Sequence, residues 1–122
     1  GWYAKIIQRL KTMQPKAKFF LMTMPRGRKE GDEQILAHRN LLHDLEKFFD
    51  YTYVLDFTEY APVYDDEFKK KFYLGGHMNP AGYILTAKMT MSYIDYIIRH
   101  NREDFAQVGF IGKDVHNYTA KW

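Results

Sequence analysis

The chain has 122 residues, of which 46% are hydrophobic and 17% aromatic, so it can bury the core of one domain and does not resemble a disordered chain. The net charge of +3 and the isoelectric point near 9.0 are only mildly basic, and they do not by themselves favour nucleic acid as a partner. There is no cysteine, no secretory signal pattern and no apolar run near the roughly 20 residues that cross a bilayer, from which we expect a cytoplasmic protein without a membrane span.

The first two expected elements are a helix at residues 2–14 and a strand at residues 17–24. Apolar residues recur at three- and four-residue steps in the helix, and Pro15 stands where a helix should end. The apolar stripe consists of Tyr3, Ile6, Ile7, Leu10 and Met13. A basic helix on a membrane surface is the alternative interpretation. The short apolar run before Pro25 is typical of a strand buried on both faces of a parallel sheet.

A polar loop and a second helix follow. Arg26, Arg28 and Lys29 make the loop basic; such a run is usually solvated, and an anion site is the alternative. Asp32 is placed to cap a helix that we expect to continue to about Phe49.

Two histidines, His38 and His43, belong to this second helix. They lie five residues apart. A metal-binding pair on one helical face normally uses a step of four, so we expect no metal shared between them.

The second expected strand covers residues 51–57, which are rich in β-branched and aromatic side chains. Asp56 falls near its carboxyl end, the edge that borders the ligand crevice in open α/β sheets. The alternative role for Asp56 is to cap the turn that follows. Further on, Asp65 and Asp66 are placed to open a short helix that ends in Lys69-Lys70-Lys71.

The stretch from Leu74 to Tyr83 combines a turn with a helix start. Gly75-Gly76 allows the backbone to turn sharply, and Asn79-Pro80 is a favourable N-cap followed by proline in the first turn. His77 is therefore expected in a tight loop, on a short tether from a rigid helix, where an imidazole is well suited to proton transfer.

The helix that begins at Pro80 is expected to continue to about His100. It is apolar around most of its circumference and should therefore pack on more than one side. Residues 101–104 should break it, residues 105–111 should form an extended or turn-rich segment over the core, and residues 113–122 read as a polar tail.

Strands that alternate with helices predict βαβ units and a parallel sheet. Only two strands are expected, however, and parallel strands rarely occur in so small a sheet. We therefore expect further strands from a segment outside this chain or from a second copy of it, giving a homo-oligomer or an association with a missing amino-terminal half. The initial Gly1 also fits a longer natural protein.

The block Gly76-His77-Met78-Asn79-Pro80-Ala81-Gly82-Tyr83 resembles the last conserved block of SGNH (GDSL-type) hydrolases, in which a catalytic histidine precedes a helix. The upstream order of strand, helix and strand is similar to the second half of that family's domain. The resemblance covers residues 2–112 but only the carboxyl half of such a domain. The expected organisation is thus residues 1–112 as that half and residues 113–122 as a tail.

The resemblance implies a flavodoxin-like three-layer α/β/α sandwich, here partial because amino-terminal strands are missing. It implies a serine esterase that hydrolyses carboxylic esters, small or carried on carbohydrate, without a metal or cofactor. His77 would be the general base, with Asn79 and Gly76 at the substrate. The serine nucleophile and the oxyanion donors would lie in blocks that this chain does not contain, so the chain alone would be inactive.

Two departures from the family pattern follow. The single serine, Ser92, stands thirteen residues into the last helix, on the order of 20 Å from its start, which is too far from His77 for a nucleophile. Family members commonly carry an aspartate three residues before the histidine, where this chain has Leu74. Three carboxylates are candidates for the orienting acid: Asp56, Asp65 and Asp66. The alternative function is a non-catalytic flavodoxin-like binding or assembly module that recognises an anion or nucleic acid.

Overall fold

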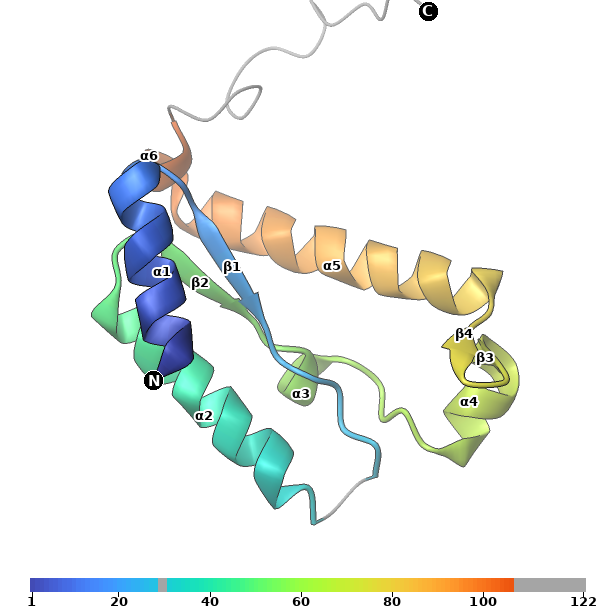
Figure 1. Ribbon diagram of the computed structural model, residues 1–122. Helices are drawn as coiled ribbons and strands as arrows, with labels where there is room; N and C mark the ends of the chain where they lie inside the picture. Colours follow the sequence, from blue (N-terminus) through green and yellow to red (C-terminus); the bar gives the residue numbers. More distant parts are fainter. Residues whose placement is uncertain (29–30, 107–122) are drawn as a thin grey trace, which may run out of the picture.

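The computed structural model describes residues 1–28 and 31–106 and has a mixed α/β architecture (Figure 1). The first four elements follow in the expected order, and both strands are shorter than the sequence suggested. They are α1 (Trp2–Met13), β1 (Phe19–Met22), α2 (Glu33–Phe48) and β2 (Thr52–Leu55). The two strands pair in parallel, with Phe19 opposite Thr52 and Met22 opposite Leu55. The predicted α/β class with a parallel pair is therefore confirmed.

The second half of the described chain is mostly helical. Its elements are α3 (Phe57–Tyr60), α4 (Asp66–Phe72), β3 (Tyr73–Leu74), β4 (His77–Met78), α5 (Pro80–His100) and α6 (Arg102–Phe105). Helices α4 and α5 were expected, and Asp65 caps α4 by accepting a hydrogen bond from the Phe68 N–H. The one-turn helices α3 and α6 and the hairpin β3–β4 were not. The expected tail at 113–122, and residues 107–111 of the segment before it, lie outside the described residues.

Helices cover both faces of the strand pair (Figure 1). Neighbouring residues of a strand point to opposite faces. Val54 packs with Ile7 of α1 and Leu42 of α2 in one buried cluster. Tyr53, its neighbour, packs on the other face against Phe105 of α6, at 5.3 Å between ring centroids. The core is therefore a narrow α/β/α arrangement built on two strands.

The apolar surfaces of α1 and α5 are only partly covered. Among the residues of α1 only Ile7 is buried, while Ile6 remains 55% exposed. The expectation that α5 packs on more than one side is wrong for the described chain. Gly82 is its one buried residue, and Met91 is 62% exposed. Two strands offer too little surface to cover helices of this length. No helix of the described segments is both long and apolar enough to cross a membrane.

The outer edge of β1 is open. Backbone hydrogen bonds to β2 come from alternate residues of β1, with the Phe19 N–H and the Thr23 N–H donating across the pair. The backbone N–H and C=O groups of Phe20 and Met22 therefore point away from β2. They have no hydrogen-bond partner among the residues that the structure describes.

The outer edge of β2 is closed instead by a side chain. The Glu46 carboxylate on α2 accepts a hydrogen bond of 2.9 Å from the outward-pointing Val54 N–H. A charged group on an edge strand prevents another strand from pairing there. The sheet can therefore extend beside β1 but not beside β2.

Candidate functional site

His77 lies on the short hairpin β3–β4, which ends directly before α5. Tyr73 pairs with Met78 and Leu74 pairs with His77, and Gly75-Gly76 forms the turn between them. Gly75 has φ +62°, a left-handed conformation in which glycine is strongly favoured. The expected sharp turn is confirmed, and it is part of a regular hairpin rather than a loop.

Asn79 joins the hairpin to both neighbouring helices. Its side-chain oxygen accepts a hydrogen bond of 2.9 Å from the Gly82 N–H, which confirms the predicted N-cap of α5. Its side-chain nitrogen donates to the Lys71 carbonyl at 2.8 Å, and its backbone N–H donates to the Phe72 carbonyl at 2.8 Å. Both ends of the Asn79 amide are thus engaged in holding α4 against α5 rather than facing a substrate.

Gly82 allows α5 to approach α4 closely. A Cβ atom at this position would lie 2.4 Å from the Phe72 carbonyl oxygen and 3.1 Å from the Met78 Cβ. No side chain fits at such distances, and the nearest atom belongs to the backbone. The glycine of the Gly82-Tyr83 pair therefore has a packing reason in this chain. Gly76, in contrast, has open space around it.

His77 presents its imidazole on the outer side of this fixed hairpin. Tyr73 and Met78 point inward, where the Met78 sulfur accepts a hydrogen bond from the Thr86 hydroxyl at 3.3 Å. His77 and its cross-strand neighbour Leu74 are exposed, and Leu74 is 79% exposed. Within the described residues, no hydrogen bond reaches the His77 ring. The arrangement is a rigid backbone that carries an accessible imidazole.

Position 74 lies directly opposite His77 across the hairpin. Residues directly opposite in an antiparallel pair have Cβ atoms about 4.5–5.5 Å apart, so a carboxylate at position 74 would reach the His77 ring. Leu74 offers no acceptor.

Asp56 lies at the end of β2 and has other partners. It is only 6% exposed, and it caps α3 by accepting a hydrogen bond of 3.2 Å from the Glu59 N–H. Its carboxylate also accepts from Arg39 Nε at 2.8 Å and lies 3.0 Å from His43 Nε2. The alternative interpretation of Asp56 as a cap is confirmed. No hydrogen bond joins it to His77, whose hairpin lies beyond α4 in Figure 1.

The pKa of Asp56 reflects this surrounding. Burial acts to raise it, but the hydrogen bonds from His43 and Arg39, together with the positive charge of Arg39, outweigh burial and hold the pKa below the ordinary value. Asp56 is therefore an ionised structural carboxylate and not a proton donor.

The Asp56 cluster comprises Thr23, Arg39, His43, Glu46 and Asp56. His43 stands between two carboxylates, with Nδ1 3.0 Å from Glu46 and Nε2 3.0 Å from Asp56. The cluster fastens α2 to the ends of both strands. Sequence reasoning missed it, although Arg39 and His43 are one helical turn apart and so share a face.

The basic loop offers less charge to an anion than the sequence suggested. Arg28 pairs with Asp32 at 3.3 Å, and Arg26 lies 3.9 Å from Glu59 and donates to the Thr58 carbonyl. Lys29 lies outside the described residues. In the part of the chain that the structure describes, no group of three or more His, Cys, Asp or Glu side chains is arranged to hold a metal ion.

Comparisons of this chain with protein-family models, with curated proteins and with solved structures found no match.

Proposed function

We propose that this chain is the carboxyl-terminal part of a flavodoxin-like, SGNH-type ester hydrolase domain in which His77 is the general base. The observation that supports the proposal is the way in which the backbone holds His77. An exposed imidazole stands on a glycine hairpin fixed by Asn79 and Gly82, directly before a capped helix and after a parallel strand pair. The motif and the order of the elements thus belong to one structural unit.

His77 would act on a serine hydroxyl and an ester carbonyl. The imidazole takes the proton from the serine hydroxyl as the serine oxygen attacks the carbonyl carbon, and it returns that proton to the departing alkoxide. Water then hydrolyses the acyl-enzyme by the same proton transfers. This chain's only serine, Ser92, stands on α5 on the order of 20 Å from its start, so the nucleophile must come from another segment.

The open edge of β1 supports the need for that segment. The unpaired backbone groups of Phe20 and Met22, and the exposed apolar residues of α1, offer a place for additional strands. A parallel sheet normally needs more strands than two. In this proposal an amino-terminal half completes the sheet there and brings the serine with it.

The orienting group of His77 would also come from outside the described residues. Asp56 is committed to Arg39 and His43, and Asp65 caps α4. A backbone carbonyl or a carboxylate of the completing segment would take this role.

An assay with p-nitrophenyl acetate tests the proposal. The 122-residue chain alone should give no turnover that depends on His77. In a protein that joins it to its amino-terminal segment, His77→Ala should lower kcat at least about a thousandfold. His100→Ala, a histidine at the opposite end of α5, should leave kcat unchanged. Equal activity of the His77→Ala variant and the parent would overturn the catalytic role.

A non-catalytic binding module is the second candidate, and the distribution of charge favours it. Residues 1–28 contain no acidic residue but carry Lys5, Arg9, Lys11, Lys16, Lys18, Arg26 and Arg28. Nucleic-acid binding that weakens steeply with salt, together with a fully active His77→Ala variant, would support this alternative instead.

A further inference from the structure

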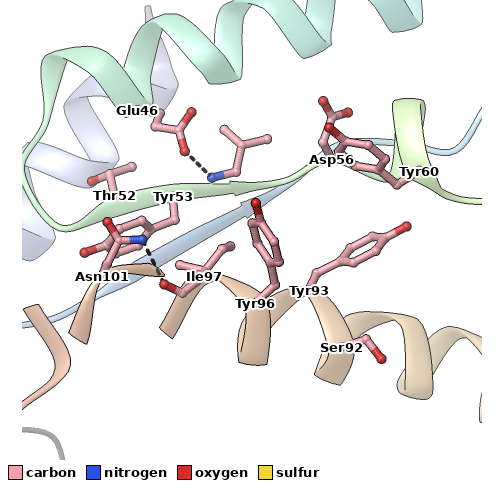
Figure 2. A pocket seen from close by; sticks show the side chains of 11 residues that line it. Glu46, Thr52, Tyr53, Asp56, Tyr60, Ser92, Tyr93, Tyr96, Ile97 and Asn101 are labelled. Atoms are coloured by element: carbon pink, nitrogen blue, oxygen red, sulfur yellow. Dashed lines mark hydrogen bonds between the residues drawn. The ribbon is translucent and has the colours of Figure 1, made fainter. Parts of the chain in front are cut away.

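A groove lies between β2 and the carboxyl-terminal half of α5, at the opposite end of that helix from His77. Its volume is about 750 Å³. Figure 2 shows Tyr93 and Tyr96 rising from α5, Tyr60 reaching in from α3, and Glu46 above the strand. Because Glu46 closes the outer edge of β2, this is not the side on which the sheet can be extended. The inference below therefore does not depend on the proposed function.

Four tyrosines line the groove: Tyr53, Tyr60, Tyr93 and Tyr96. Tyr60 and Tyr93 lie 6.2 Å apart, with their rings close to perpendicular. Tyr60 is 72% exposed and Tyr96 62% exposed. The His100 ring stacks on Tyr96 at 3.9 Å between ring centroids, so a ligand would use the other face of the Tyr96 ring. The face of an aromatic ring is electronegative and attracts a cation.

The charged residues that line the groove are both acidic. They are Glu46 and Asp56, and neither lysine nor arginine belongs to the lining. Arg39 pairs with Asp56 and His43 stands between the two carboxylates, but neither is part of the lining. The negative charge of Asp56 also contributes, after burial, to a raised pKa of Tyr93. The groove is therefore aromatic on its open side. Asp56 is compensated by Arg39, and Glu46 is the acidic side chain of the lining that remains partly exposed.

The same chain shows how such rings are covered elsewhere. The Lys18 ammonium lies 3.4 Å from the centre of the Tyr51 ring, and the Lys5 ammonium lies 4.9 Å from the Trp2 ring. Within the described residues, no lysine or arginine covers a tyrosine of the groove in this way.

We propose that the groove binds an organic cation, a quaternary or alkylated ammonium group held over Tyr60 and Tyr96 with the partly exposed Glu46 as counter-charge. The ring faces would attract the positive group, and the apolar surface between them would accommodate its alkyl substituents. Ser92 and Asn101 also line the groove and supply polar contacts for the rest of such a molecule.

Choline and its uncharged carbon analogue 3,3-dimethyl-1-butanol make a direct test, because they share a shape and differ in charge. In ¹H–¹⁵N spectra of the whole chain, choline should shift the amides of residues 92–97 and 52–56, and the analogue should not. Equal binding of both would mean that the groove recognises only apolar shape, and would overturn the proposal. Absence of binding by choline would also overturn it.

Variants of the exposed residues locate the site without disturbing the core. Tyr60→Leu and Tyr96→Leu should each weaken choline binding about two- to fivefold, whereas Tyr60→Phe keeps the ring and should bind normally. Glu46→Gln keeps a side-chain oxygen for the Val54 N–H and removes the charge, so it should also weaken binding. Tyr83→Leu is the matched control, since Tyr83 is 58% exposed on the same helix and does not line the groove. An equal loss in the control would contradict this location.

Discussion

Asp56 is a residue on which several polar contacts in this structure converge. Its carboxylate accepts hydrogen bonds from the side chains of Arg39 and of Thr23, which directly follows β1. It also lies beside His43 and caps α3. It is nearly buried, so these partners replace the water that an ionised carboxylate would otherwise need. Its charge therefore helps to hold α2 against the ends of the two strands and the start of α3.

The variant Asp56→Asn should remove the negative charge and keep the helix cap, because asparagine caps helices equally well. It therefore measures the contribution of the charge alone. The folded pKa is below the ordinary value, so the unfolded chain binds the extra proton as the pH falls. The stabilisation is therefore complete at neutral pH and is lost as the pH falls through the folded pKa, below about 4. Urea unfolding should show the variant weaker by about 2–3 kcal/mol at pH 7, with the difference vanishing in acid.

Asp65→Asn is the control for this prediction. Asp65 also caps a helix, but no ion pair involves it in the described structure. Its replacement should cost much less and should not depend on pH in the same way. A pH-independent loss in Asp56→Asn would show that the carboxylate charge is not what stabilises the fold.

At this scale the sequence predicted caps better than ion pairs, with one exception. Asp32 stands at the start of α2 as expected, but the prediction that it caps the helix is wrong, because its carboxylate accepts hydrogen bonds from Gly27 and Arg28 in the preceding loop instead. Asn79 and Asp65 were recognisable because a cap depends on residues three positions away. The partners of Asp56 could not be named, because Arg39 is seventeen and His43 thirteen residues away, and only the packing of α2 against β2 brings them together. The accessible position of His77 followed from local turn chemistry. The absence of a hydrogen-bonding partner for its ring among residues 1–28 and 31–106 did not.

At the scale of elements, α4, the hairpin and α5 form one unit. The Phe72 carbonyl ends α4, accepts the Asn79 N–H and lies against Gly82. Inside, Tyr64 and Phe68 stack at 4.0 Å between ring centroids. The unit fixes the backbone of His77 from both sides.

Gly82→Ala should loosen this unit. The new Cβ would lie 2.4 Å from a backbone oxygen, so α5 would have to move away from α4, at about 1–3 kcal/mol. Thermal unfolding should show a lower Tm, and hydrogen exchange should increase in residues 73–82. Gly76→Ala is the matched control, because nothing lies within 4 Å of its added Cβ and it should be tolerated. Equal stability of both variants would contradict the close approach.

The helices and the two central strands could be predicted because their periodicity extends over many residues. Helix α5 has the expected bounds, and both strands lost only their ends. The hairpin could not be predicted, because its strands have only two residues each. Two residues are too few to show the alternation of apolar and polar side chains that identifies a strand. The one-turn helix α3 was missed for the same reason, although Asp56 as its cap was the available signal.

At the scale of the molecule, the fold is narrow for the apolar surface it carries. Trp2 is 79% exposed, Met13 65% and Ile84 58%, on helices that lie on both faces of the sheet. Sequence reasoning anticipated a sheet that needs more strands. Which edge of the strand pair is open could not be anticipated, because it depends on the hydrogen bond between Glu46 and the Val54 N–H.

Self-association through β1 should be measurable. Light scattering should show a mass that grows with concentration, and Met22→Pro should reduce it by blocking the outer edge. The Met22 N–H bonds to nothing in the described chain, so proline removes no internal hydrogen bond. Met91→Lys, on the exposed face of α5, distinguishes helix contacts from strand pairing. A monodisperse monomer at high concentration would contradict association by either surface.

The single hydrogen bond between Glu46 and Val54 also sets a stoichiometry. A sheet with two open edges can add copies without limit, as in a fibre. A sheet with one open edge can pair with only one other copy. Two copies that join at their β1 edges use up both available edges, and growth along the backbone then ends. We therefore expect any association of this chain through strand edges to stop at a pair, because Glu46 occupies the edge of β2.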